Sequence, residues 1–298
     1  MMRRAKFNTY GIDEWEKEFA EIYGNVDIQR KPTEMWLLLV EDSSKFAEFI
    51  RREKYAKALT ALAHVFCWTC SFIWRCRSEN DLGIQIHKPL SRIIWDKYPA
   101  RCCLCGQERC ICSVRRLELE ELPEKKKKKK LEEIEEDLKI ARDRTENIPS
   151  TLDDFTTMFS NIYKGAHYAM PIEAIAFHFM EEVGEVSTCI RRLREKGKGQ
   201  SLSEVGVNRL KNNLENEIAD VISWTMSLLS KLDYMLGAGV TYLRRFKTSE
   251  DAEKKELLQT ASLRLSSIVW ESYQTPDGNT LYCPVCKTRP CDCKPISL

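Results

Sequence analysis

The sequence predicts an all-α fold in which one helical layout occurs twice. Residues 12–52 align without gaps with residues 152–192, and further matched blocks follow in both copies. Apolar residues recur at three- and four-residue intervals, Gly and Pro lie between these segments, and no convincing strand alternation occurs. Both copies also end in the same cysteine spacing. We therefore expect two tandem helical bundles within one chain, each followed by a short knuckle of four cysteines.

The expected helices form four matched pairs. Short amphipathic helices at 14–23 and 154–163 come first, followed by 33 to about 52 and 171 to about 195. Pro171 suits the first turn of its helix, because the missing N–H has no partner to lose there. The third pair covers 55–76 and 207–236, and the fourth ends at Trp95 and Trp270 in the matched blocks 91–95 and 266–270. Short hairpins inside the cysteine clusters are the only strands expected.

The chain divides into two repeats and a linker. Its 298 residues are enough for two domains, which we place at 8–113 and 150–298. The linker at 114–149 contains six consecutive lysines at 125–130, followed by an acidic block. Charge blocks of this kind are usually solvated, so a partly helical linker is favoured over a polyanion-binding segment.

Composition disfavours several classes of partner. The formal net charge is only +2, and no patch of basic and aromatic residues accompanies the lysine run, so nucleic-acid binding is disfavoured. No apolar run approaches the roughly 18 residues of a membrane span. The first residues lack the apolar segment of a secretion signal. A cytoplasmic protein without a membrane partner is expected. A homo-oligomer is compatible with the sequence, but no particular residues indicate it.

The cysteines indicate metal sites. In a reducing compartment, tight cysteine clusters favour metal over disulfides. Each repeat ends in C-x2-C-x4-C-x-C, which can close a tetrahedral shell around a structural Zn²⁺, giving two zinc ions per chain. An iron–sulfur cluster is disfavoured because the thiols lie so close in sequence. Cys103 could replace its neighbour Cys102, but the matched spacing favours Cys102. The expected ligands are Cys102, Cys105, Cys110 and Cys112, and Cys283, Cys286, Cys291 and Cys293.

Two pairs of acidic residues lie on apolar helix faces of the second repeat. Glu182 and Glu185 are three residues apart, as are Glu217 and Asp220, so each pair shares one side of its helix. Unpaired carboxylates beside a hydrophobic seam are costly. A divalent cation removes this conflict, and Mg²⁺ prefers oxygen ligands. The alternative interpretation, surface glutamates on two helices, applies to any single pair but less well to two pairs on adjacent helices.

The first repeat has lost these acids. Asp42, Lys45, Ala61 and His64 stand where the second repeat has Glu182, Glu185, Glu217 and Asp220. Lys45 cannot ligate a cation and would repel one. His64 is more consistent with a packed histidine than with a metal ligand. We therefore expect one retained cation site and one lost site.

The acidic blocks resemble a known family. The segments 182–186 (EVGEV) and 217–221 (EIADV) are similar to the ExxE…ExxD signature of the all-α nucleotide pyrophosphohydrolases. These include the MazG-like enzymes, dimeric dUTPases, dCTP pyrophosphatases and phosphoribosyl-ATP pyrophosphohydrolase. The resemblance covers about 152–236, and 12–76 in the degenerate copy. The gap between the acid pairs is long, the lysine and asparagine that often follow the fourth family helix have no secure counterpart, and the cysteine clusters lie outside the minimal domain.

The resemblance implies Mg²⁺-dependent hydrolysis of a nucleoside triphosphate, NTP or dNTP, to the monophosphate and pyrophosphate. Glu182, Glu185, Glu217 and Asp220 would be the metal ligands, although one of them, such as Glu182, could instead orient the attacking water. Members of the resembled superfamily pack as dimers of helical bundles, so the resemblance implies that the two tandem MazG-like bundles of this chain form a pseudo-dimer. The second repeat would be catalytic and the first a scaffold, lid or nucleotide sensor. The alternative is a non-catalytic nucleotide-sensing or zinc-stabilised assembly module. Base and sugar preference cannot be read from the sequence.

Overall fold

The computed structural model describes residues 9–78, 82, 85–196, 204–243, 265–276 and 280–293. Within these ranges the regular structure is helical, and the sole pairing of extended chain is the isolated bridge between Gln274 and Leu281. The prediction of an all-helical fold is confirmed for this part of the chain. The bridge lies just before the second cysteine cluster, close to where a short hairpin was expected.

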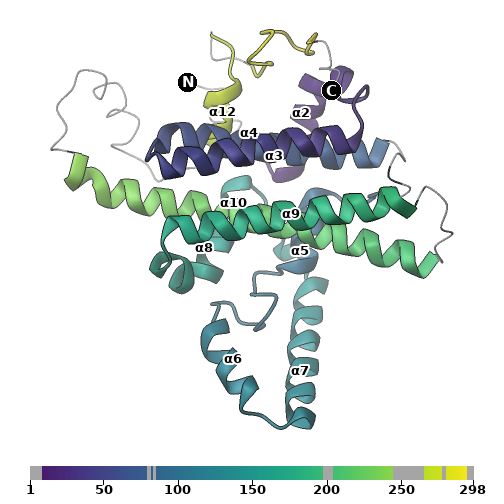
Figure 1. Cartoon of the computed structure of the whole chain (residues 1–298), viewed down its shortest axis with the longest axis vertical. Helices are drawn as coiled ribbons and strands as arrows, with labels where there is room; N and C mark the ends of the chain where they lie inside the picture. Colours follow the sequence, from purple (N-terminus) through teal and green to yellow (C-terminus); the bar gives the residue numbers. More distant parts are fainter. Residues whose placement is uncertain are drawn as a thin grey trace.

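Four long helices form the centre of the molecule. Helix α3 (Pro32–Arg51) packs on α4 (Tyr55–Ser78), and α9 (Ile172–Lys196) packs on α10 (Glu204–Leu243). The two pairs meet where α3 contacts α9 and α4 contacts α10 (Figure 1). At the α3–α9 interface the rings of Phe46 and Phe179 lie 5.9 Å apart, edge to face. Trp36 also donates a hydrogen bond of 2.9 Å to Ser187 across this interface.

The apolar faces predicted for α9 and α10 are buried. Every residue of both stripes is at most 7% exposed, because each faces another helix. The stripe residues are Ile172, Ile175, Phe179, Val183, Val186, Ile190 and Leu193 on α9, and Leu210, Leu214, Ile218, Val221, Thr225 and Leu228 on α10. Burial of such stripes, rather than helix propensity alone, gives helices of this kind their stability.

Shorter helices flank the centre and connect the two repeats. Helix α5 (Leu90–Lys97), from the first repeat, packs on α10 of the second, and α12 (Leu265–Tyr273), from the second, packs on α4 of the first. Figure 1 shows α12 on the side of the α3–α4 pair and α5 on the side of the α9–α10 pair. The fourth helix of each repeat therefore covers the other repeat.

Each exchanged helix remains tied to its own repeat at its start. Ser91 of α5 donates a 2.9 Å backbone hydrogen bond to Asp13 on α2 (Ile12–Asp27). Ser266 of α12 donates a 2.9 Å hydrogen bond to Asp153 on α8 (Leu152–Ala169). These two pairs occupy matched positions of the duplication, so the same serine–carboxylate contact orients both helices.

The cysteine segments continue the exchange. We name residues 102–112 knuckle 1 and residues 283–293 knuckle 2. The Cys110 N–H donates to the Ile162 carbonyl of α8 at 2.7 Å, and the Cys291 N–H donates to the Ile22 carbonyl of α2 at 2.6 Å. Knuckle 1 of the first repeat thus bonds to the second repeat, and knuckle 2 of the second repeat bonds to the first, in both cases through matched residues. Arg289 of knuckle 2 adds ion pairs to two glutamates of α2.

The charged linker forms a helical arm. Helices α6 (Cys112–Glu120) and α7 (Glu124–Asp143), followed by a 3₁₀ turn at Thr145–Asn147, extend away from the bundle (Figure 1). Only Ile134 and Leu138 of α7 are buried. Trp95 donates a 3.1 Å hydrogen bond to the Arg142 carbonyl and ties the base of the arm to α5. The predicted solvated, partly helical character of the linker agrees with this exposure.

One described helix has the length and composition of a membrane span. The span would run from Tyr55 to Arg77 within α4, with a mean hydropathy of 1.3 over its best window. However, 72% of that window is buried inside the bundle by α2, α3 and α12. Its apolar composition therefore matches its place as a core helix.

Candidate functional site

Three of the four predicted acids lie together between α9 and α10. Carboxylate oxygens of Glu182, Glu217 and Asp220 lie within 4.8 Å of one another. We call these three residues the acid site. The packing of α9 on α10 brings them together, because Glu182 faces α10 while Glu217 and Asp220 face α9. This donor set of hard oxygen atoms could hold a divalent cation.

Glu185 lies apart from this group. It is one turn further along α9 than Glu182 and is exposed, and its carboxylate is not among the clustered oxygens. Its charge nevertheless raises the pKa of both Glu182 and Glu217, so it lies within electrostatic reach of the acid site.

Two residues of the first repeat complete the acid site. Lys97, the last residue of α5, forms an ion pair with Asp220 and donates a 3.3 Å hydrogen bond to the Asn216 carbonyl. The next residue, Tyr98, donates its hydroxyl to the other oxygen of Asp220 at 2.5 Å. Its ring packs edge to face on Phe159 of α8, with centroids 5.2 Å apart. The exchanged helix therefore delivers a cation and a hydroxyl to a carboxylate of the second repeat.

Burial changes the acidity of the site. Removal from water, together with the neighbouring charge of Asp220, raises the pKa of Glu182 to about 7, although the Trp224 hydrogen bond opposes the shift. Burial likewise raises the pKa of Glu217. The ammonium of Lys97 opposes this rise, while the charges of Asp220 and Glu185 add to it, and the resulting pKa is about 7. Without a bound cation, the site therefore holds protons close to neutral pH.

An aromatic stack borders the acid site. Trp224 donates a 3.2 Å hydrogen bond to Glu182. The rings of His167 and His178 each stack on the indole with centroids 4.9 Å away, and Tyr163 stacks on His167 at 4.6 Å. Burial lowers the pKa of His167 to about 4, so this imidazole is neutral at physiological pH.

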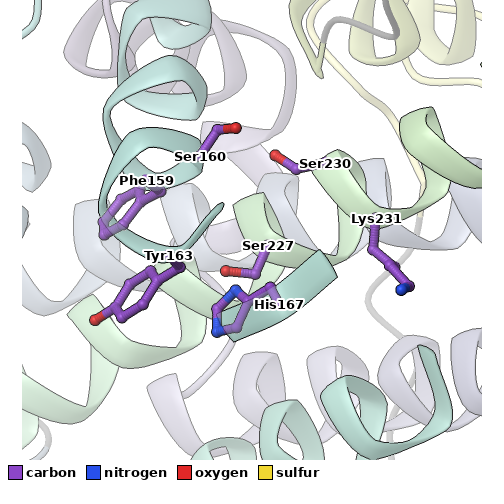
Figure 2. A pocket seen from close by; sticks show the side chains of 7 residues that line it. All are labelled: Phe159, Ser160, Tyr163, His167, Ser227, Ser230 and Lys231. Carbon is purple, nitrogen blue, oxygen red and sulfur yellow. The ribbon is translucent and has the colours of Figure 1, made fainter. Parts of the chain in front are cut away.

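Two members of this stack, Tyr163 and His167, also line a small cavity. Figure 2 shows Tyr163 and His167 of α8 facing Ser227 of α10, with Lys231 at the edge. The cavity encloses about 10 Å³ of space for a water-sized sphere, roughly the room for one water molecule. A nucleobase does not fit there without movement of the lining side chains.

In the first repeat, the position that corresponds to the acid site is occupied by charged groups that pair with one another. Trp68 donates a 3.0 Å hydrogen bond to Asp42, as Trp224 does to Glu182. Lys45 lies 3.1 Å from the same carboxylate, and His64 lies 3.9 Å from it. Burial lowers the pKa of His64 despite the nearby Asp42. One carboxylate, an ammonium group and a largely neutral imidazole make a poor cation site.

The eight matched cysteines form two groups. Within each knuckle, the four sulfur atoms lie within 4.8 Å of one another, and Cys103 is not part of its group. The sulfur–sulfur distances include 3.5 Å for Cys102–Cys112 and 3.6 Å for Cys286–Cys291. A tetrahedral ion with metal–sulfur bonds of about 2.3 Å places its ligands about 3.8 Å apart. Either group could therefore hold a zinc ion.

Both knuckles contain the same kind of backbone turn. The Gly106 N–H bonds to the Cys102 carbonyl and the Lys287 N–H to the Cys283 carbonyl, both at 2.8 Å. Gly106 has φ of 69° and Lys287 has φ of 61°. Glycine adopts this left-handed conformation without strain, whereas a lysine adopts it at some cost. A left-handed turn is thus kept in both copies although only one has glycine.

We predict close to two zinc ions per chain. Protein purified without chelator should give this ratio by elemental analysis. Replacing Cys291 with Ser should lower the melting temperature, because metal-binding energy contributes to folding energy in such sites. Cys189→Ser is the matched control, since Cys189 is a buried thiol outside both clusters. Stoichiometric iron with visible absorption, or no bound metal, would contradict the zinc assignment.

Comparison with known proteins identifies no relative. No protein-family description, characterised protein or solved structure matches this chain. The interpretation of the acid site therefore rests on its own geometry and on the internal duplication.

Lys97, Tyr98 and Trp224 are not among the site residues predicted from the sequence. For two of them a signal was present, because the duplication matches Tyr98 with Tyr273 and Trp224 with Trp68. Tyr273 packs edge to face on His64, the counterpart of Asp220, with centroids 5.8 Å apart. Lys97 had no such signal, since Ser272 stands at its matched position.

Proposed function

We propose that the second repeat hydrolyses a nucleoside triphosphate to its monophosphate and pyrophosphate with Mg²⁺. The observation that carries this proposal is the acid site, in which oxygen atoms of Glu182, Glu217 and Asp220 lie within 4.8 Å of one another on two packed helices. The resemblance of EVGEV and EIADV to the signature of the all-α pyrophosphohydrolases supports the reaction type.

The chemistry follows from the donor set. A cation held by these carboxylates, with Glu185 one turn away, would neutralise charge on phosphate oxygens and lower the pKa of an attacking water. Catalysis of phosphoryl transfer consists mainly of positioning and electrostatic stabilisation, which a rigid pair of helices provides. Trp224 fixes the orientation of Glu182 through its 3.2 Å hydrogen bond, and Tyr98 fixes that of Asp220.

We also propose that the two repeats form a covalent pseudo-dimer. The reciprocal hydrogen bonds of Cys110 to Ile162 and Cys291 to Ile22 support this arrangement, because a two-fold relation requires each contact to occur in both directions. The first repeat is then a scaffold that supplies Lys97 and Tyr98 to the acid site.

The test is release of pyrophosphate from a panel of NTPs and dNTPs with MgCl₂, with EDTA and heat-treated protein as controls. The expected result is turnover of at least one triphosphate, abolished by EDTA. Nucleotide binding without turnover would instead favour the nucleotide-sensing module. The panel also reports the base and sugar preference.

Cation binding by the acid site should depend on pH. Glu182 and Glu217 have pKa values raised to about 7, so protons compete with the metal below that pH. We expect Mg²⁺ affinity to fall as the pH is lowered from about 8 to 6, and Mg²⁺ binding at pH 7 to release protons. Calorimetry in buffers of different ionisation enthalpy measures both quantities. Equal affinity across this range would contradict the prediction, and Glu217→Gln should reduce the proton release.

A further inference from the structure

The most unusual contact of the acid site is its ion pair with a lysine of the first repeat. The Lys97 ammonium pairs with Asp220, donates a hydrogen bond of 3.3 Å to the Asn216 carbonyl, and lies 5.9 Å from the centre of the Tyr98 ring. Its side chain is only 19% exposed. The ammonium is also close enough to lower the pKa of both Glu182 and Glu217. It therefore acts on all three carboxylates at once.

The first repeat contains a comparable lysine in a different arrangement. Lys45 lies 3.1 Å from Asp42 and 2.8 Å from Glu41. All three residues belong to α3, so this ammonium is fixed beside its carboxylates by the helix itself. Lys97, in contrast, reaches Asp220 from another helix and from the other repeat. A lysine thus neutralises the matched place in both repeats, but only the second repeat retains further acids that a metal could use.

A metal ion and this ammonium cannot share Asp220. Mg²⁺ binds a carboxylate oxygen at about 2.0–2.1 Å and requires near-octahedral geometry. An ammonium within ion-pair distance of the same oxygen would repel the ion strongly at such short range. Binding of the metal through Asp220 therefore requires Lys97 to withdraw.

We propose that Lys97 is a built-in placeholder cation, which holds the acid site in the absence of metal and is displaced by the divalent ion. This inference rests on the proposed function in assigning the acid site to a divalent cation. The first repeat in this way regulates a site whose acids all lie in the second. Tyr98 keeps its hydrogen bond to Asp220 and anchors the segment that carries Lys97.

Direct metal binding tests the proposal without any turnover. The dissociation constant of Mn²⁺ is measured by electron paramagnetic resonance at fixed pH and ionic strength, without nucleotide. Lys97→Met removes the charge and keeps the length, and it should tighten Mn²⁺ binding at least about fivefold, since a competing unit charge a few ångströms away is lost. Lys97→Arg keeps the charge and should stay within about twofold of the unmodified protein.

Lys88→Met is the matched control. Lys88 also belongs to the first repeat and also pairs with an acid of α10, with 2.8 Å between its ammonium and Glu215. The Lys88→Met substitution also removes one positive charge from a contact between the repeats, but away from the acid site. Mn²⁺ affinity should therefore change less than about twofold. Circular dichroism establishes that each variant keeps its helical content. Unchanged or weaker Mn²⁺ binding by folded Lys97→Met would overturn the proposal.

Amine labelling provides a second measurement on the unmodified chain. Brief acetylation followed by mass spectrometry should modify Lys97 several times faster when Mn²⁺ is present, while Lys88 shows no change. Equal labelling of Lys97 with and without saturating Mn²⁺ would overturn the displacement. The proposed function can fail separately: tighter Mn²⁺ binding by Lys97→Met without pyrophosphate release from any triphosphate would support the placeholder and refute the hydrolase. Absence of Mn²⁺ binding in both proteins would refute both.

Discussion

Replacing Glu217 with Gln, or Asp220 with Asn, is expected to reduce pyrophosphate release at least a hundredfold while leaving the helical content unchanged. Each change removes a charged oxygen ligand from a cluster of three, so metal affinity and stabilisation of the transition state fall together. Initial rates at saturating Mg²⁺ and triphosphate measure the effect. Both residues are on the buried side of α10, so circular dichroism must accompany the rates.

Glu181→Gln is the matched control for these variants. Glu181 is adjacent to Glu182 in sequence but exposed, and its carboxylate lies 3.2 Å from His178 rather than in the acid site. The rate of pyrophosphate release by the Glu181→Gln variant should stay within about twofold of that of the unmodified protein. Lys45→Ala should also leave turnover largely intact. If either acid variant keeps more than about a tenth of the rate, a loss of less than about 1.4 kcal/mol, the assignment of the metal ligands fails.

Expressing residues 150–298 alone is expected to give aggregates or a symmetric dimer. Removal of the first repeat uncovers the face of α10 that packs on α4 and α5, and also the face of α12 that packs on α4. An apolar surface of this size rarely stays exposed on a monomer in water. Light scattering measures the association state. Co-expression with residues 1–149 is the control and should restore a soluble one-to-one complex.

A symmetric dimer of this fragment makes a further expectation testable. Tyr273 of one copy would take the place of Tyr98, and Ser272 that of Lys97, so the fragment should bind Mn²⁺ as tightly as the Lys97→Met variant. A soluble monomer with full activity would contradict the pseudo-dimer, because it would show that the second repeat needs no partner.

The helices could be predicted because their signals are local. The apolar stripe of α9 from Ile172 to Leu193 follows the helical period, and all of it is buried. At the start of α8, Thr151 and Asp154 form reciprocal hydrogen bonds of 3.0 and 3.1 Å, a pattern of residue types that marks a helix start. The cysteine spacing is similarly local, and the four thiols of each knuckle lie close together.

The site could be predicted only in part because its partners are distant in sequence. The three-residue spacing placed Glu182 and Glu185 on one side of α9, but how far each reaches into the α9–α10 contact depends on how the two helices are rotated. Glu185 accordingly lies outside the group of three. Comparing each repeat with the other also matched Tyr98 to Tyr273 without indicating that each serves the opposite repeat. That exchange is a property of packing, which no local pattern encodes.

The exchange of knuckles constrains the order in which the protein can fold. During synthesis α2 and α4 emerge long before Tyr273, whose ring packs on Phe19 at 5.3 Å, and before Cys291, which bonds to Ile22. Domains usually fold in sequence as they leave the ribosome. Here the first repeat cannot complete its core until α12 and knuckle 2 have been made, so a chain interrupted before α12 has an unfinished core in the first repeat.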